Sequence, residues 1–328
     1  MLEEYEIIRP TDRSLISRGL DCILSEAENA GRAVPADLAE RRQAFDAYCA
    51  LYELDTSRQV LALRGQQIIG VCLWVATPGR TALFYIPQTV TSELPASVAQ
   101  VQCIIQAAQD AAAAGMALGQ VILPPEAQAT AALYRRADFS DLATLLYMHR
   151  HRPLFQPSLT LPPECQVITY TPDSRIEFAQ TIQASYAQTL DCPRLSNLRN
   201  MDDVMVSHQG NAFDPALWFL LKRNGRNAGV LLLAQRPENA VLELVYLGLV
   251  PHCRGIGLGT QLVKLALQTV VRMRAAGMTL AVDRANTPAV HLYRSQRFEQ
   301  TAERQVLIHP FPAPISPTGL HQWRRNSA

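Results

Sequence analysis

Apolar and polar positions follow the same order of patterns twice along the chain. Each half begins with two helical periodicities, continues with three strand-like stretches, and then has one long amphipathic helix. In the first half the helices are expected at 13–29, 35–51 and 96–114, and the strands at 60–63, 68–76 and 82–86. In the second half the helices are expected at 174–189, 195–208 and 258–276, and the strands at 218–222, 228–235 and 240–250.

A short strand, a short helix containing Leu-Tyr and a last strand complete each half. This mixture predicts an α/β (α+β) domain, in which a mixed, mostly antiparallel sheet is flanked by helices.

Short sequence matches indicate that the halves are duplicates. Leu133–Phe139 resembles Leu292–Phe298, and Ile69–Leu73 resembles Ala228–Leu232, both at an offset of 159 residues. A third match between them lies at an offset of 162 residues. Such a period is far too long for a solenoid. The predicted division is a first copy over 1–152, a linker over 153–165, a second copy over 166–310 and a Pro-rich tail over 311–328.

Composition narrows the class of protein. Of 328 residues, 48% are apolar and 18% are charged, and 30 Lys and Arg nearly balance 29 Asp and Glu. No dominant attraction to nucleic acid or to a membrane surface is expected from that balance. Seven cysteines without C-x-x-C spacing argue against a disulfide framework and a zinc ribbon. The sequence shows no signal-peptide pattern, so we expect a cytoplasmic protein that needs no metal.

A glycine-rich loop in the second copy is the clearest chemical signal. An apolar strand ending at Val250 runs into Arg254–Thr260, which reads R-G-I-G-L-G-T and opens the long helix. Glycines let the backbone approach a ligand closely, and a helix N-terminus offers free N–H groups to an anion such as pyrophosphate. The G-x-G-x-G spacing fits neither a Walker A loop nor the Rossmann turn. The alternative is an ordinary glycine-rich turn.

A second motif lies one helix and one strand further on. Asn286 begins N-T-P-A-V-H-L-Y, and Phe298 follows. The two segments together resemble the Gcn5-related N-acetyltransferase (GNAT) superfamily, with Arg297 standing where the family usually has glycine. The tandem arrangement also resembles that of the mycothiol synthases, which are two-GNAT-domain enzymes.

The resemblance implies an acetyl-CoA site in the second copy. The implied cofactor-binding residues are Gly248, Leu249, Val250, Arg254, Gly255, Ile256, Gly257, Leu258, Gly259, Thr260 and Asn286. Two of them have structural alternatives, because Thr260 and Asn286 could simply cap helices. The equivalent stretch of the first copy, 85–95, has neither glycine nor arginine. We therefore expect the first copy to be a degenerate GNAT-like domain that shapes the cleft.

Two residues are candidates for catalysis. Glu243 lies on an apolar strand, where burial would raise its pKa toward that of a general base; the alternative is a salt-bridged glutamate. Strand periodicity predicts that Glu243, Val245, Leu247 and Leu249 share one face. The resemblance implies that Tyr293 protonates the CoA thiolate; the alternative is a core tyrosine, since Tyr134 occupies the equivalent position in the first copy.

The acceptor side is less specific. Tyr186, Asp191 and Asp203 are candidates for binding an amine, and an ordinary surface loop is the alternative. The expected function is direct transfer of an acetyl group from acetyl-CoA to a small-molecule or peptide amine. The alternatives are a non-catalytic CoA-binding or sensing module and a purely structural tandem scaffold. The oligomeric state stays open, and a monomer whose copies form an intramolecular pseudo-dimer fits the duplication.

Overall fold

A computed structural model of the chain describes residues 5–25, 37–87, 94–196, 198–210, 212–236 and 240–311. The helices in these ranges are α1 (Arg13–Leu24), α2 (Leu38–Leu51), α3 (Leu94–Ala113), α4 (Gln128–Arg136), α5 (Arg175–Ser185), α6 (Met201–Gln209), α7 (Leu258–Arg272) and α8 (Thr287–Ser295). The strands are β1 (Glu6–Ile8), β2 (Gln59–Arg64), β3 (Gln67–Thr77), β4 (Thr81–Tyr85), β5 (Leu118–Leu123), β6 (Ser140–His151), β7 (Cys165–Thr169), β8 (Trp218–Arg223), β9 (Arg226–Arg236), β10 (Val241–Leu249), β11 (Gly277–Asp283) and β12 (Glu299–Pro310).

The duplication predicted from the sequence is confirmed in the elements themselves. Strands β2, β3 and β6 and helix α4 recur as β8, β9, β12 and α8, each shifted by the same 159 residues. Each half has a mixed, mostly antiparallel sheet flanked by helices, as expected. Several helices are shorter than their periodicity suggested, α5 and α6 among them, because loops occupy their predicted ends.

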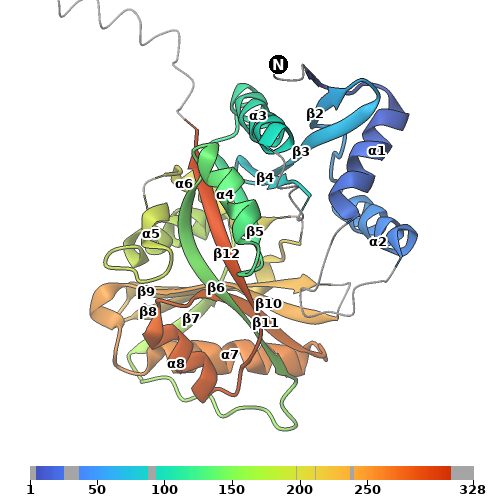
Figure 1. The fold of residues 1–328 in the computed structure, drawn as a ribbon. Coiled ribbons are helices and arrows are strands. Elements are labelled where there is room, and N and C mark those ends of the chain that lie inside the picture. The colour runs from blue at the N-terminus through green and yellow to red at the C-terminus, as the bar shows by residue number, and fades with distance from the viewer. Residues whose placement is uncertain are drawn as a thin grey trace, which may run out of the picture.

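The two halves share one sheet by exchanging their last strands. The order of the described strands is β1-β2-β3-β4-β5-β12-β6-β11-β10-β9-β8-β7. Strand β12 of the second half pairs with β5 of the first, and β6 of the first half pairs with β11 of the second. These two long strands also pair antiparallel with each other and run through the middle of the molecule (Figure 1). No sequence pattern indicated this exchange. The order of elements along the chain is the same whether β6 pairs with β5 or with β11, so the order does not distinguish the two pairings.

Helices cover both faces of the sheet in the second half. On one face α7 and α8 bury Leu262, Val263, Leu267 and Tyr293 against β9, β10 and β11. On the other face α5 and α6 bury Phe178, Ile182 and Met205 against Trp218 and Leu232. Figure 1 shows these two pairs of helices on opposite sides of the sheet. The strands between them are therefore almost continuously apolar, as expected for strands covered on both faces.

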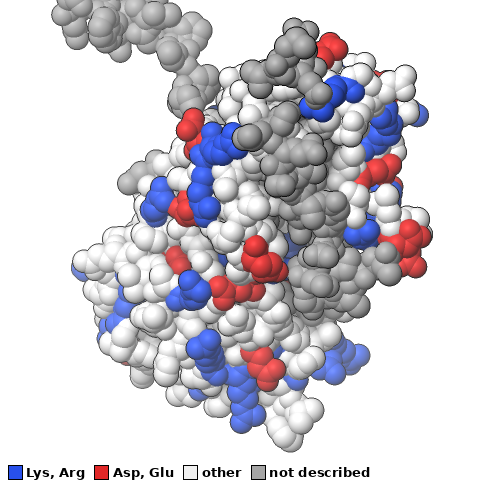
Figure 2. Space-filling model, in the orientation of Figure 1, with Lys and Arg blue, Asp and Glu red and all other residues white. Residues whose placement is uncertain are grey.

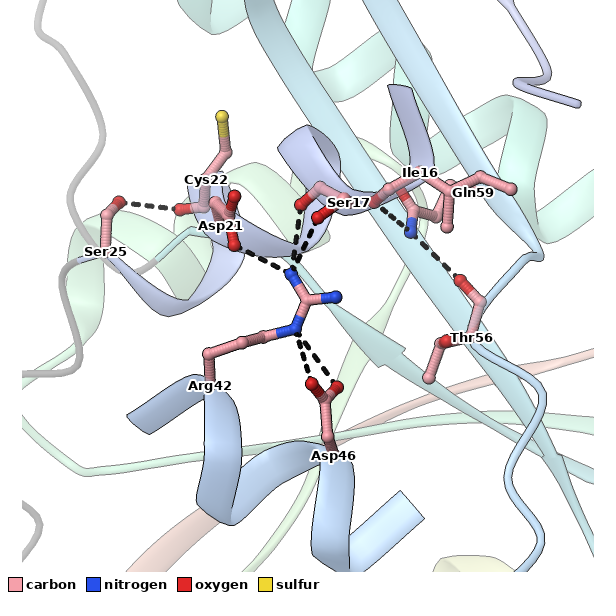
Figure 3. Close-up of polar contacts among 9 residues, drawn as sticks. All are labelled: Ile16, Ser17, Asp21, Cys22, Ser25, Arg42, Asp46, Thr56 and Gln59. Carbon is pink, nitrogen blue, oxygen red and sulfur yellow. Dashed lines mark hydrogen bonds and ion pairs between the residues drawn. The ribbon is translucent and has the colours of Figure 1, made fainter. Parts of the chain in front are cut away.

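The first two helices are joined by a polar cluster on α2. Arg42 donates to the carboxylates of Asp46 and Asp21 and to Ser17 (Figure 3). Nearby, the amide of Gln59 donates to the carbonyl oxygens of Ile16 and Thr56 at 3.1 and 2.9 Å. These contacts fix the α1–α2 pair to the start of β2, in addition to a small apolar cluster in which Leu20 and Phe45 pack near Leu73 of β3.

Charge is dispersed over the surface. Figure 2 shows basic and acidic side chains interspersed on the visible face, as the near-neutral net charge of +1 suggests. Within the described ranges, no helix is long and apolar enough to cross a membrane. Over the same ranges, His, Cys, Asp and Glu form no group of three or more able to hold a metal ion.

Candidate active site

Strand β10 bends away from its parallel neighbour halfway along its length. It pairs with β11 only through Leu242–Leu244, whereas its antiparallel pairing with β9 continues to Leu249. A bulge between Leu244 and Tyr246 leaves Val245 as an extra residue. Beyond it, no described strand pairs with the edge of β10 that faces β11. The equivalent strand β4 ends at Tyr85, so among the described residues this splayed extension occurs in the second half.

The bulge also corrects a prediction about side-chain direction. Val245 and Tyr246 both pack toward the α5–α6 side, whereas Leu247 and Leu249 pack toward the α7–α8 side. The expectation that Glu243, Val245, Leu247 and Leu249 all share one face is therefore wrong for Leu247 and Leu249. One inserted residue shifts a period-two pattern to the opposite face.

A cavity of about 210 Å³ fills the gap between the diverging strands. One wall is Leu244–Leu249 of β10, and the other is Ala281 and Val282 of β11 together with α8. We call this space the donor cleft. Asn286, Tyr293 and Arg254 also line it.

The glycine-rich loop stands at one end of this cleft. Gly255 and Gly257 have φ of +74° and +87°, a conformation that favours glycine, and a Cβ on either would point into open space. Gly257 is the N-cap of α7 and provides no side-chain hydrogen bond to the helix. The first N–H groups of a 15-residue helix are thus free for an anion. Leu258 is buried, Ile256 is exposed, and Thr260 lies in the first turn.

Arg254 has a definite structural task in this loop. Its guanidinium donates to the carbonyl oxygens of Leu249 at 3.0 Å, Gln188 at 3.1 Å and Ser185 at 2.7 Å. It thereby ties the end of β10 to the C-terminal end of α5. The loop is held against two elements before any ligand binds.

Gly248 is required by a close contact across the cleft. The hydroxyls of Ser185 and Tyr246 are 2.7 Å apart, and a Cβ at Gly248 would lie 2.5 and 2.7 Å from them. Burial raises the pKa of the Tyr246 phenol. Asn286 caps α8 by accepting from the N–H of Ala289 at 3.4 Å, so its capping alternative is realised in the structure.

Tyr293 and its counterpart in the first half have different surroundings. Tyr293 is 6% exposed and lines the donor cleft, and burial raises its phenol pKa, which keeps the hydroxyl protonated. Tyr134 is fully buried, and its hydroxyl has no hydrogen-bond partner in the described part of the chain. Tyr134 and Tyr293 occupy equivalent positions in the sequence of the two halves. Of the two, Tyr293 lines the donor cleft.

A second cavity, of about 290 Å³, adjoins the donor cleft. Four residues line both spaces: Thr189, Asp191, Val245 and Tyr246. The rest of the second cavity is formed by the loop after α5 and by α6, including Tyr186, Arg199 and His208. We call it the acceptor cavity. Burial raises the pKa of the Tyr186 phenol to about 12.

Asp191 lies at the boundary of the two cavities. It accepts a hydrogen bond from the backbone N–H of Asp283 at 3.1 Å, and Asn286 donates to it from its side chain. Burial, aided by the nearby Asp283 carboxylate, raises the pKa of Asp191. A carboxylate at this boundary suits an amine that must face the donor cleft.

The other two predicted carboxylates lie elsewhere. Glu243 accepts from Arg236 at 2.6 Å, which is the salt-bridged alternative considered from the sequence, and it lines neither cavity. It lies two residues before Val245, which lines both. Asp203 also lies outside both linings and pairs with Arg80 of the first half at 3.4 Å.

Sequence reasoning missed three residues of the acceptor cavity. Arg199 in the loop after α5, His208 in α6 and Tyr246 in β10 carry no motif, so no local sequence signal could have found them. The first half contributes directly to this region. Arg199 donates to Thr81 at 3.4 Å, and the β3–β4 turn at Gly79 packs on the backbone of α6. The first-half loop expected at 85–95 lies outside the described residues over 88–93.

Comparisons with known proteins agree with this geometry. Residues 186–298 match the acetyltransferase (GNAT) family model. The chain is 29% identical over 188 residues to a mycothiol acetyltransferase of Acidothermus cellulolyticus, covering 53% of this chain and 56% of that protein. The chain thus spans little more than half the length of the curated relatives it matches.

Solved structures resemble the whole fold. A GCN5-related N-acetyltransferase from Sphaerobacter thermophilus has a TM-score of 0.60 at 16% identity, covering 95% of this chain and 97% of that one. A tandem GNAT protein from the clavulanic acid biosynthesis pathway has a TM-score of 0.51 at 15% identity, covering 95% and 100%. Residues 186–298 are thus similar to the GNAT family, and the whole chain has the fold of a tandem GNAT protein, with the repeated elements as its two copies.

Proposed function

We propose that the second half transfers an acetyl group from acetyl-CoA to a primary amine by direct reaction in a ternary complex. One observation carries the proposal. The splayed end of β10 joins a glycine-rich helix N-terminus, a narrow cleft and a second polar cavity in one continuous line. Such a line suits a donor with a pyrophosphate at one end and a reactive thioester near the other.

The residues of the donor cleft fit CoA in chemistry and in space. The free N–H groups of Leu258, Gly259 and Thr260 would hold the pyrophosphate, and the open positions at Gly255 and Gly257 let it approach. The unpaired edge of β10 over Tyr246–Leu249 would bind the pantetheine amides as an added strand does. Arg254 positions both elements through its three carbonyl contacts.

Acetyl-CoA would supply the activated acyl group, and this chain's residues would manage the protons. Asp191 would bind the amine at the boundary of the two cavities, and Glu243 would take its proton through a water molecule. A backbone N–H at the splay would stabilise the oxyanion. Tyr293, kept protonated by its raised pKa, would return a proton to the departing sulfur.

The test is release of free CoA thiol from acetyl-CoA across a panel of primary amines. Calorimetry with CoA should find one site per chain, because the first-half stretch 85–95 has neither glycine nor arginine and the described part of β4 ends at Tyr85. Two sites would contradict the assignment of a degenerate first copy. Tight binding of one CoA without turnover on any amine would favour the alternative of a CoA-sensing module.

A further inference from the structure

We propose that the acceptor carries a carboxylate beside its amine, so that it is an amino acid or a close analogue, and that Arg199 binds this carboxylate. The proposal deepens the acetyl-transfer function above and rests on it. It assigns a specificity-determining role to a residue that no sequence motif indicated.

The Arg199 guanidinium is a cation in the wall of the acceptor cavity, and it makes no ion pair with a carboxylate among the described residues. Its one hydrogen bond among the described residues is the long contact of 3.4 Å with the Thr81 hydroxyl. The charge of Asp203 raises the pKa of Arg199, but the Asp203 carboxylate forms its ion pair with Arg80 at 3.4 Å. Burial lowers the pKa of Arg199, which reflects the cost of desolvating its charge. A cation placed in this way is stabilised when a ligand brings an anion.

A second polar group in the same wall has no partner. The Nε2 atom of His208 is buried, and no group in the described ranges hydrogen-bonds to it. Burial and the charge of Arg199 lower the pKa of His208 to about 4, so the ring is neutral at pH 7. A neutral imidazole can donate from Nε2 to an oxygen already held by Arg199. Buried polar atoms without partners are uncommon, and ligand recognition is one reason for them.

The residues that line one or both spaces indicate the direction of the ligand. Asp191 lines both the donor cleft and the acceptor cavity, whereas Arg199 and His208 line the acceptor cavity alone. An amine beside Asp191 therefore faces the donor cleft, and the carboxylate points away from it toward Arg199. An acidic and a basic side chain in the lining of one cavity match the zwitterion of an amino acid.

Size and shape favour a carboxylate over larger anions. The cavity volume of about 290 Å³ is at the lower end for ligand sites and suits a molecule of amino-acid size. A planar guanidinium binds a carboxylate with two parallel hydrogen bonds. Met201, Val204 and Leu195 supply apolar contacts for a side chain.

The experiment compares amines that differ only in the carboxylate. The pairs are L-leucine with isoamylamine and L-phenylalanine with phenethylamine; phosphoethanolamine and glucosamine test other acceptors. Wild-type kcat/KM should favour the amino acid by about 10- to 100-fold, the value of hydrogen bonds to a charged group. Arg199→Gln should abolish that preference while leaving CoA affinity unchanged, because Arg199 lines the acceptor cavity and not the donor cleft.

Control variants separate recognition from folding. Arg175→Gln removes an exposed arginine of α5 that pairs with Asp202, and it should leave the preference intact. Arg199→Lys keeps the charge but loses the planar fork, and it should retain part of the preference. Equal activity of wild type on both members of each pair, or an unchanged preference in a folded Arg199→Gln protein, would overturn the proposal.

Binding measurements distinguish this proposal from the proposed function. Calorimetry of each amine with the CoA-loaded protein needs no turnover. If no thiol is released but amino acids bind and Arg199→Gln weakens them, acetyl transfer fails and the carboxylate site stands. If glucosamine or phosphoethanolamine is acetylated and no amino acid binds, the carboxylate assignment fails and acetyl transfer stands.

Discussion

Asp191 and Asp283 link a loop to a strand end through a pair of reciprocal hydrogen bonds between carboxylate and backbone. The Asp191 carboxylate accepts from the N–H of Asp283 at 3.1 Å, and the Asp283 carboxylate accepts from the N–H of Cys192, next to Asp191, at 3.1 Å. The loop after α5 is thus fixed to the end of β11, although 92 residues separate the two. Cys192 takes a left-handed φ of +43° at this point, a strained conformation that the two hydrogen bonds help to maintain.

Asp191→Asn should raise the thermal stability of the protein and weaken its binding of the amine. Burial raises the pKa of Asp191 in the folded protein, so ionising it there is less favourable than in the unfolded chain. The cost is absent at pH values below the ordinary aspartate pKa and grows as the pH rises above it. Asparagine keeps an acceptor for the Asp283 N–H without a charge. Relative to wild type, the variant's Tm should rise as the pH increases from the ordinary aspartate pKa of about 3.9 through the raised pKa of the folded protein, while KM for the amine increases. A pH-independent difference in Tm would contradict this reading.

Gly257→Val should abolish CoA binding by blocking the approach to the helix N-terminus. The backbone strain of a positive φ should cost about 1–2 kcal/mol in the free energy of unfolding. Gly225→Val is the matched control, because Gly225 also has a positive φ of +73° and open space around its Cβ, but lies in the β8–β9 turn. Both variants should lose similar stability in urea unfolding, and only Gly257→Val should lose CoA affinity in calorimetry. Equal CoA affinity in the two would remove the loop from the binding site.

Tyr293→Phe should slow turnover by about 100-fold or more, since a positioned acid or base contributes that much. CoA affinity should stay unchanged, because only a hydroxyl facing the cleft is lost. Tyr134→Phe removes the corresponding buried and unpartnered hydroxyl of the first half. It should leave turnover intact and raise the free energy of unfolding by about 1 kcal/mol. Loss of activity in both variants would indicate a packing role for the Leu-Tyr helix.

Part of this organisation could be predicted from the sequence, and part could not. The motifs from Arg254 to Phe298 predicted the fold because each depends on local geometry: glycines at positive φ, a helix start and an asparagine cap. The bulge at Val245 was missed because an inserted residue in an apolar run leaves no polar mark. The exchange of β6 and β12 was missed because the apolar pattern of each strand fits a partner strand in either half, β5 or β11, equally well. Arg199 and Thr81 meet across 118 residues, beyond any local pattern.

Gly79→Ala should impair the acceptor cavity from the first half of the chain. A Cβ there would lie 2.3 Å from the Asp203 carbonyl oxygen and 2.6 Å from the Cβ of Ser207, so α6 would have to move. Because small displacements of a substrate wall reduce rates strongly, kcat/KM for the amine should fall about tenfold or more while CoA affinity is kept. Gly65→Ala, at a first-half turn with φ of +59° and nothing nearby, should change stability alone. Normal kinetics in Gly79→Ala would mean that the first half does not shape the cavity.

Glu243→Gln tests the proposed base most directly. The glutamate lies on β10 two residues before Val245, on the side of the sheet that carries the acceptor cavity, and it is paired with Arg236. Glutamine can still accept from Arg236, so the fold and CoA affinity should be kept while kcat falls by about 100-fold or more. The loss should shrink at high pH, where the amine arrives already neutral and needs no base. Arg236→Gln is the control, because it breaks the same pair but leaves the carboxylate. If Arg236→Gln is as slow as Glu243→Gln, the ion pair is structural; if Glu243→Gln keeps wild-type turnover across the pH range, Asp191 becomes the candidate base.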